Sequence, residues 1–106
     1  MKHIYSLLAA ALFAGVATLS AADAKKIVFL AGPPSHGPGD HEHRAGCLLL
    51  ASCLNQSPGV ACEVYSNGWP QNADSAFADA AAIVVYSDGG GGHPLLRATA
   101  SKSSAA

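Results

Sequence analysis

Three short apolar runs, each followed at once by loop-forming residues, constrain the fold of this chain most strongly. They are Lys26–Ala31, Val60–Tyr65 and Ala82–Ser87. The first is a continuous run of β-branched and aromatic residues closed by glycine and two prolines, which is typical of a strand buried on both faces of a parallel sheet. The third run has the same character, and we interpret it as another buried strand.

Helical segments are predicted between these strands. Residues His41–Gln56 contain no proline and predict a helix, with Asp40 as the residue that caps its first turn. A shorter helix is predicted from Asp74 or Ser75 through Phe77. The alternation of strands and helices predicts right-handed crossovers and an α/β, flavodoxin-like three-layer fold with a parallel sheet.

The first 24 residues have the composition of a secretory signal peptide. A short basic start precedes the nearly uncharged run Ile4–Leu19, and small residues at Ala22 and Ala24 occupy the positions that a signal peptidase reads. A membrane anchor is the alternative, but the run is shorter than the roughly 20 residues needed to span a bilayer. We therefore expect a secreted or periplasmic protein without membrane contact after cleavage.

The remaining chain divides into a domain over residues 25–96 and a tail over residues 97–106. The tail contains small and polar residues without a hydrophobic period, so we expect it to be disordered. A third strand this apolar should not lie open at a sheet edge. We expect the domain to be the N-terminal part of a larger one, truncated after the third strand. The change of character at Arg97 resembles a frame shift, and the sequence leaves open whether this ending is native. A homo-oligomer or partner chain that completes the sheet is the alternative.

Charge and cysteine content exclude two further classes. With 6 Lys+Arg against 7 Asp+Glu and no basic stripe, the chain is not expected to bind nucleic acid. Its 3 cysteines are an odd number, which argues against a disulfide framework. Cys47 and Cys53 point about 120° apart on the predicted helix and cannot bridge there. A Cys53–Cys62 bridge stays open, although we favour cysteines that pack as small hydrophobic residues.

The loops that follow the strands carry the residues that could bind a ligand or take part in a reaction. Ligands of open α/β sheets bind outside the carboxyl ends of the strands, where the strand order changes direction. If the first and third strands are neighbours, every histidine except His3 lies at this rim. The candidate ligand-binding residues are His36, His41, Glu42, His43, Trp69, Asp88, Gly89, Gly90 and His93.

One interpretation of this rim is a site for a divalent metal ion, because imidazoles and carboxylates are common ligands of zinc and related ions. His41 and His43 are two residues apart, so on a helix they would point in different directions and only one could join a shared ion. We name His36, His41 and His93 as the candidate metal ligands. The alternative is that His41 and Glu42 are exposed residues of a first helical turn.

A second interpretation is acid-base chemistry or the binding of a polyhydroxy ligand. Histidines and carboxylates exchange protons near neutral pH and form hydrogen bonds with hydroxyl groups, and Trp69 adds an aromatic face. The glycines after Asp88, including Gly89 and Gly90, permit a close backbone approach to an anion, with a flexible turn as the alternative. Ser87-Asp88-Gly89 is half of a nucleophile elbow, but Val85 replaces its first glycine, so we do not expect a covalent intermediate.

Several ordered motifs together resemble the opening of a ThuA-like domain, the trehalose-utilisation family. The resemblance runs from Lys25 to about Leu96 through these segments: Lys26–Gly32, Ser35–Gly37, His41–His43, Ala45–Leu50, Asn67–Pro70 and Tyr86–Pro94. It implies a sheet related to the class I glutamine amidotransferase superfamily and a role in sugar or glycoside metabolism. The nucleophilic cysteine of the amidotransferases has no counterpart here, because Cys47 lies in a predicted helix and Cys62 in a predicted strand.

We therefore expect a secreted ThuA-like domain fragment whose parent acts on or binds a carbohydrate-derived small molecule through the histidine-rich rim. A non-catalytic module that binds a ligand or partner, or an inactive truncated product, is the alternative. The sequence leaves open whether the chain is an enzyme and assigns no catalytic residue. A divalent metal is the one cofactor that the residues suggest.

Overall fold

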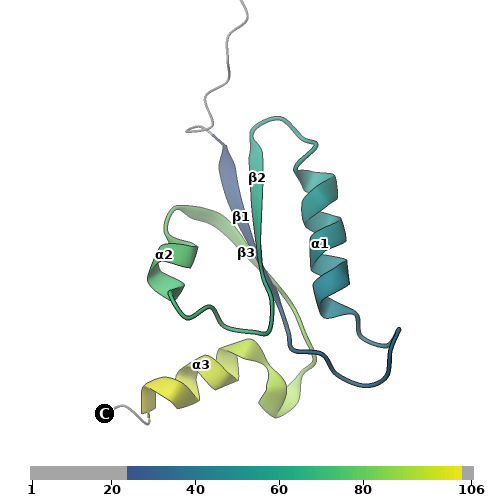
Figure 1. Cartoon of the computed structure of the whole chain (residues 1–106). Coiled ribbons are helices and arrows are strands. Elements are labelled where there is room, and N and C mark those ends of the chain that lie inside the picture. Colours follow the sequence, from purple (N-terminus) through teal and green to yellow (C-terminus); the bar gives the residue numbers. More distant parts are fainter. Residues whose placement is uncertain (1–23, 104–106) are drawn as a thin grey trace, which may run out of the picture.

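The computed structural model describes residues 24–103, with side chains described through residue 98. The predicted signal peptide therefore lies outside the described residues except for Ala24. The elements follow one another along the chain in Figure 1 as β1 (Lys25–Ala31), α1 (His43–Leu54), β2 (Val60–Tyr65), α2 (Ala73–Phe77), β3 (Ala80–Tyr86), the short 3-10 helix η2 (Gly90–Gly92) and α3 (Pro94–Ser103).

The three strands form one parallel sheet in the order β2-β1-β3. Ile27 of the central strand aligns with Cys62 on one side and with Ala82 on the other. The order confirms that the first and third strands are neighbours. It also confirms the predicted α/β fold of the flavodoxin-like type with a parallel sheet, because each strand returns to the sheet after a helix.

The core is built on β1. Its residues from Val28 to Ala31 are almost fully buried, as predicted for a strand covered on both faces. Helix α1 covers one face and presents Cys47 and Ala51 to Phe29, while α2 lies over the opposite face (Figure 1). Ile27, Cys62 and Val64 pack around this cluster while remaining partly exposed. Strand β1 is therefore the element around which the described part of the chain is organised.

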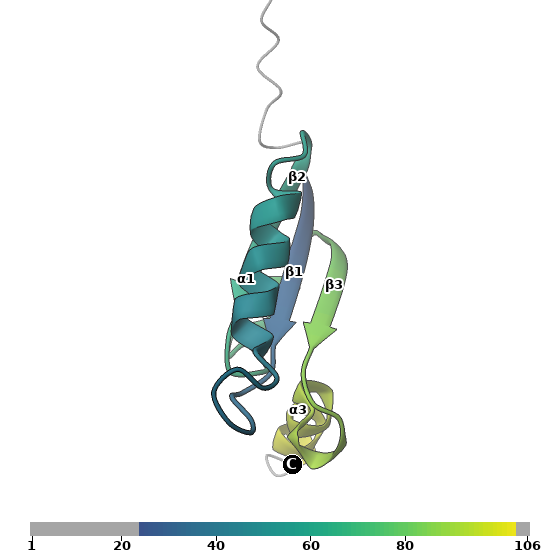
Figure 2. The same cartoon turned by 90° about the vertical axis from the view of Figure 1, so that its right-hand side faces the viewer.

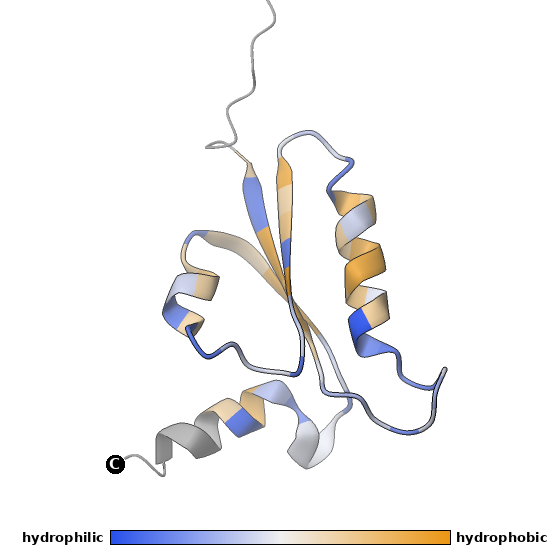
Figure 3. Ribbon diagram, in the orientation of Figure 1, coloured by the Kyte–Doolittle hydropathy of each residue, from blue (hydrophilic) through white to orange (hydrophobic). Residues whose placement is uncertain are grey.

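The prediction that the third strand is buried is wrong. Ile83, Val84 and Tyr86 of β3 keep 48%, 37% and 43% of their surface exposed. Figure 2 shows the reason: α1 lies in front of β1 and β2, whereas β3 lies beside it at the edge of the sheet. Helix α1 is likewise only partly covered, because Leu50 and Leu54 remain exposed while Cys47 and Ala51 are buried. Figure 3 shows these apolar segments of the strands and of α1 in orange.

The N-terminus of α1 also differs from the prediction. The helix begins at His43, Glu42 occupies the capping position, and no side chain caps it. Asp40 does not cap the helix but donates its backbone N–H to the carbonyl of Gly37 in a turn. The Glu42 carboxylate accepts the backbone N–H of Gly39 at 2.9 Å, so it orders the loop instead of the helix. The predicted start at His41 is therefore two residues early.

The segment predicted as a disordered tail from Arg97 belongs to α3 as far as Ser103. Pro94 is the first residue of this helix, where its missing N–H costs no hydrogen bond. The His93 imidazole accepts the backbone N–H of Leu95 at 3.3 Å. Alanine, arginine and lysine are good helix formers, so the segment can be helical without an apolar period. Across residues 24–103, no helix has the length and apolar character to cross a bilayer.

The three cysteines are unpaired and occupy different environments. Cys47 is buried, Cys62 is intermediate and Cys53 is exposed. The interpretation of cysteines as small buried residues thus holds for Cys47 but not for Cys53, and the Cys53–Cys62 bridge does not form. Burial raises the pKa of the Cys47 thiol above its ordinary value, which keeps this side chain neutral and unreactive in the core.

Candidate functional site

The candidate site lies at the carboxyl edge of the sheet, where the chain leaves β1 and β3. The backbone N–H of Gly32 donates to the carbonyl of Tyr86 at 2.9 Å, which extends the β1–β3 pairing beyond the strands. The loop that follows Gly32 therefore begins next to the loop that follows Tyr86. Asp88 from the second loop thereby approaches the histidines of the first.

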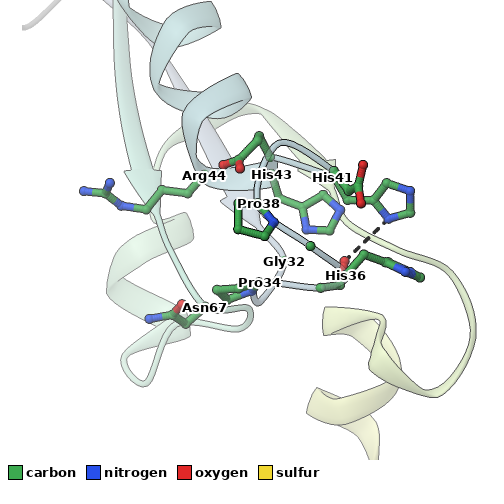
Figure 4. A pocket seen from close by; sticks show the side chains of 12 residues that line it. Gly32, Pro34, His36, Pro38, His41, His43, Arg44 and Asn67 are labelled. Atoms are coloured by element: carbon green, nitrogen blue, oxygen red, sulfur yellow. Dashed lines mark hydrogen bonds between the residues drawn. The ribbon is translucent and has the colours of Figure 1, made fainter.

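His41 and Asp88 form the closest polar pair of this site. The Nδ1 atom of His41 lies 2.7 Å from Oδ1 of Asp88. The Ser35 hydroxyl lies 3.5 Å from the same imidazole nitrogen, and the dashed line in Figure 4 marks this contact. Because a carboxylate only accepts hydrogen bonds, Nδ1 carries the proton and Nε2 of His41 is the nitrogen left for another partner.

His43 is a buried neighbour of this pair and contacts Asp88. Its side chain is only 3% exposed, and its Nδ1–H donates to the carbonyl of Pro33 at 3.1 Å. Its Nε2 lies 3.4 Å from the same Oδ1 atom of Asp88. The ring also makes an edge contact with Tyr86, with the ring centroids 5.0 Å apart. His43 is thus a packed residue that joins the loop, β3 and α1, and both of its nitrogens have neighbours.

Two histidines of the site have a backbone conformation that L side chains rarely adopt. His36 and His41 have φ angles of 60° and 43°. Such left-handed conformations outside glycine cost of order 1–3 kcal/mol and persist only where the surrounding contacts hold them. Here they bring the two imidazoles into an edge contact with centroids 4.4 Å apart. The unfavourable backbone conformation at these two positions therefore accompanies the contact between the two imidazole rings.

A cavity of about 260 Å³ opens beside these residues, and we call it the histidine cavity. His36, His41, Glu42 and His43 line it together with Ser35 and Asn67. Figure 4 shows the side chain of Arg44 directed away from the imidazoles of His36, His41 and His43. The volume lies just below the range of about 300–1,000 Å³ that is usual for small-molecule sites.

The Asp88 carboxylate is held in its ionised form. A hydrogen bond from the Ser35 hydroxyl contributes most to lowering the pKa of Asp88 below its ordinary value, and His41 and His43 lower it further. Partial burial raises the pKa of Asp88, but by less than these contacts lower it. Asp88 therefore offers a negative charge to the histidines throughout the neutral pH range.

The same geometry forms a candidate group for a metal ion. One ligand atom each of His36, His41 and Asp88 lie within 4.8 Å of one another, and these residues are mostly exposed. Two imidazoles and a carboxylate suit zinc or another divalent transition metal. His36 and His41 were predicted as ligands, but His93 is not part of the group. Asp88 replaces it, because η2 separates His93 from the site and its imidazole contacts the first turn of α3.

Other predicted site residues lie outside the histidine cavity. Trp69 packs against Phe77 with ring centroids 5.0 Å apart and lines different cavities. Asp88, Gly89 and Gly90 do not line it either, although Asp88 contacts His41 and His43 beside it. Gly90 has the positive φ of 68° that a glycine accommodates without strain. The rim that the sequence predicts as one site is therefore divided in space.

Ser35 and Asn67 are site residues that the sequence analysis did not select. Ser35 contacts His41 and stabilises the Asp88 carboxylate, and Asn67 lies in the wall of the cavity. Their signal in the sequence was position alone, because both lie in loops directly after strands and next to other candidate residues. A hydroxyl or amide beside a histidine is too common to be selected without the structure.

Comparison of the chain with models of protein families, with curated proteins and with solved structures finds no match.

Proposed function

We propose that the histidine cavity binds a carbohydrate-derived small molecule, in keeping with the resemblance of the sequence to ThuA-like domains. The observation that carries the proposal is the hydrogen bond between His41, which lines the cavity of about 260 Å³, and Asp88 beside it. Hydroxyl groups need partners that both donate and accept hydrogen bonds. The histidines that line the cavity supply both functions, and Asp88 acts on a ligand through its hydrogen bond with His41.

The pair also favours a chemical role for His41. Asp88 fixes the imidazole with its proton on Nδ1, so the lone pair of Nε2 is available to accept a proton from a ligand hydroxyl. A His–carboxylate pair of this kind orients a general base, and the resulting imidazolium is stabilised by the ionised Asp88. The geometry supports proton transfer in the ligand without a covalent intermediate on the chain.

Calorimetric titration with a panel of mono- and disaccharides and their oxidised derivatives tests the proposal. We expect at least one ligand to bind, and His41→Ala to weaken its binding by about tenfold or more. His93→Ala is the matched control, because this histidine lies at the same edge but does not line the cavity. Equal losses in both variants would contradict the proposal. Product formation from the bound ligand would assign catalysis, and binding without turnover would indicate a non-catalytic module.

A divalent transition metal is the second candidate ligand, favoured by the clustered donor atoms of His36, His41 and Asp88. The two functions make different demands on Asp88. In the acid-base pair it accepts the Nδ1 proton of His41, whereas in a metal site its oxygen binds the ion directly.

Titration with Zn²⁺ in the absence of sugar separates the two functions. A metal site predicts that His36→Ala and Asp88→Asn each abolish Zn²⁺ binding, with His93→Ala as the control that retains it. The absence of saturable Zn²⁺ binding to the natural chain would rule out the metal site.

A further inference from the structure

A second concave surface lies on the other side of Asn67, where the chain leaves β2. Two overlapping cavities of about 560 and 520 Å³ share the residues Trp69, Pro70, Gln71, Asn72 and Ser75, and we call this surface the Trp69 cleft. Tyr65 and Asn67 line one end, and Ala98 of α3 lines the other. Both volumes are within the range of small-molecule sites.

The Trp69 cleft combines an aromatic wall with unused hydrogen-bonding groups. The Asn72 side chain does not cap α2, although it stands at the capping position. Among the described residues, the side-chain amides of Asn67, Gln71 and Asn72 have no hydrogen-bond partner in the protein. Each amide offers two donors and an oxygen acceptor. The cleft therefore presents several free donors and acceptors around one indole ring.

The charge of the cleft limits the ligand further. Asp74 is its one ionisable acidic residue within the described part of the chain, and neither lysine, arginine nor histidine lines it. An anion would find no counter-charge there, and a purely apolar ligand would leave the amides unpaired. A neutral ring with an apolar face and hydroxyls on its periphery matches both parts of the surface.

We propose that the Trp69 cleft binds the pyranose ring of a neutral sugar, with the C–H face of the ring against Trp69 and its hydroxyls against Gln71 and Asn72. The proposal rests on the proposed function in that both surfaces would hold parts of one carbohydrate-derived ligand. Asn67 lines both the histidine cavity and the Trp69 cleft, so the two surfaces are contiguous. The cleft would then select the part of the ligand that does not react.

Intrinsic fluorescence tests this proposal directly, because Trp69 is the only tryptophan of the chain. The probes are the methyl glycosides of glucose, galactose and mannose, with acyclic sorbitol as the control that has hydroxyls but no ring face. We expect at least one glycoside to change the emission of Trp69 with saturation in the millimolar range, and sorbitol to have no such effect. The absence of a saturable change with all three glycosides, or an equal response to sorbitol, would overturn the proposal.

Variants assign the response to the cleft. Gln71→Ala and Asn72→Ala should each weaken glycoside binding by about fivefold or more. Gln56→Ala is the matched control, since this glutamine bonds to the Ser52 carbonyl near the end of α1, away from the cleft. Unchanged binding in both cleft variants would refute the assignment. Circular dichroism establishes that each variant folds.

The histidine variants separate this proposal from the function proposed above. Methyl glycoside binding reported by Trp69 should be retained in His41→Ala, because His41 does not line the cleft. A silent Trp69 together with calorimetric binding that depends on His41 would refute the cleft and leave the histidine cavity intact. A Trp69 response together with sugar binding that is indifferent to His41 would support the cleft and refute the proposed function.

Discussion

Asp88 connects the loop that follows β3 to the loop that follows β1, since His41, His43 and Ser35 all act on its one carboxylate. Its pKa is lower in the folded chain than the ordinary value of 3.8. The folded state therefore binds this proton less readily than the unfolded state does. It follows that ionised Asp88 stabilises the fold above its ordinary pKa, and that this contribution is lost as the pH falls through the lower, folded-state pKa.

We predict that the difference in unfolding free energy between the natural chain and Asp88→Asn is constant above about pH 5 and shrinks under more acidic conditions. Urea unfolding at a series of pH values measures it. Ser35→Ala should shift the loss to higher pH, because the Ser35 hydroxyl contributes most to the lowered pKa of Asp88. A difference that grows on acidification would contradict the prediction.

His43 and His36 differ in burial and should differ in their effect on stability. His43 is 3% exposed and bonds to Pro33 and Asp88, whereas His36 is exposed. Replacing His43 by alanine leaves a void and an unpaired carbonyl, so we expect His43→Ala to cost about 1–3 kcal/mol of unfolding free energy. His36→Ala should stay within about 0.5 kcal/mol. Thermal unfolding followed by circular dichroism measures both, and similar losses would show that burial of His43 is unimportant.

The sequence identifies the histidines and Asp88 as candidates because parallel strands bring the loops at their carboxyl ends to one edge. It does not reveal which of them meet. His93 is separated from the others by η2, and Trp69 packs against Phe77, so these two residues share the edge but not the cavity. Which residues come into contact depends on the conformations of the loops, and the spacing of residues in the sequence does not predict these. The left-handed backbone of His36 and His41 is an example.

At the scale of elements, the strands are more predictable than the ends of the helices. The range Val60–Tyr65 is identical in the prediction and in β2, because a short segment bounded on both sides by turn residues is a local signal. The start of α1 depends on His41, whose positive φ ends the loop before the helix, and histidine has no strong signal for this conformation. The exposure of β3 depends on its edge position, which is a property of the sheet and not of the strand.

Gly32 allows β1 and β3 to approach closely where they enter the candidate site. A Cβ atom at this position would lie 2.5 Å from Cβ and 3.0 Å from Cα of Ser87. Because the neighbouring backbone would have to move, we expect Gly32→Ala to destabilise the fold by about 1–3 kcal/mol. It should also displace Asp88 from His41, which the NMR signals of the His41 ring would report.

Gly89→Ala is the matched control for this change. A Cβ atom at Gly89 meets nothing within 4 Å, and its φ of −77° suits any residue. We expect no loss of stability there, and a gain of up to about 1 kcal/mol because alanine restricts the unfolded chain. If Gly89→Ala were as harmful as Gly32→Ala, close approach of the strands would not explain the role of Gly32.

At the scale of the whole molecule, apolar side chains are unevenly divided between a small core and a large exposed surface. The buried apolar residues belong chiefly to β1 and to one side of α1. Leu48, Leu49 and Leu50 on the remaining surface of α1 are 42%, 65% and 50% exposed. The number of apolar residues in the sequence therefore suggests a larger core than the described residues form. Stability should therefore depend on few residues, and hydrophobicity alone should not identify them.

Phe29 and Leu49 test this division, because both are large apolar residues in regular elements. Phe29 is 2% exposed and central to the core, so we expect Phe29→Ala to cost about 3–5 kcal/mol. A domain of this size has a total stability of only about 4–12 kcal/mol, so this variant should be largely unfolded or close to it. Leu49→Ala should change the unfolding free energy by less than about 0.5 kcal/mol, since most of its side chain already contacts water. Urea midpoints of the two variants decide the matter: a loss at Leu49 comparable to that at Phe29 would mean that the outer face of α1 is covered in solution and that the core extends beyond β1.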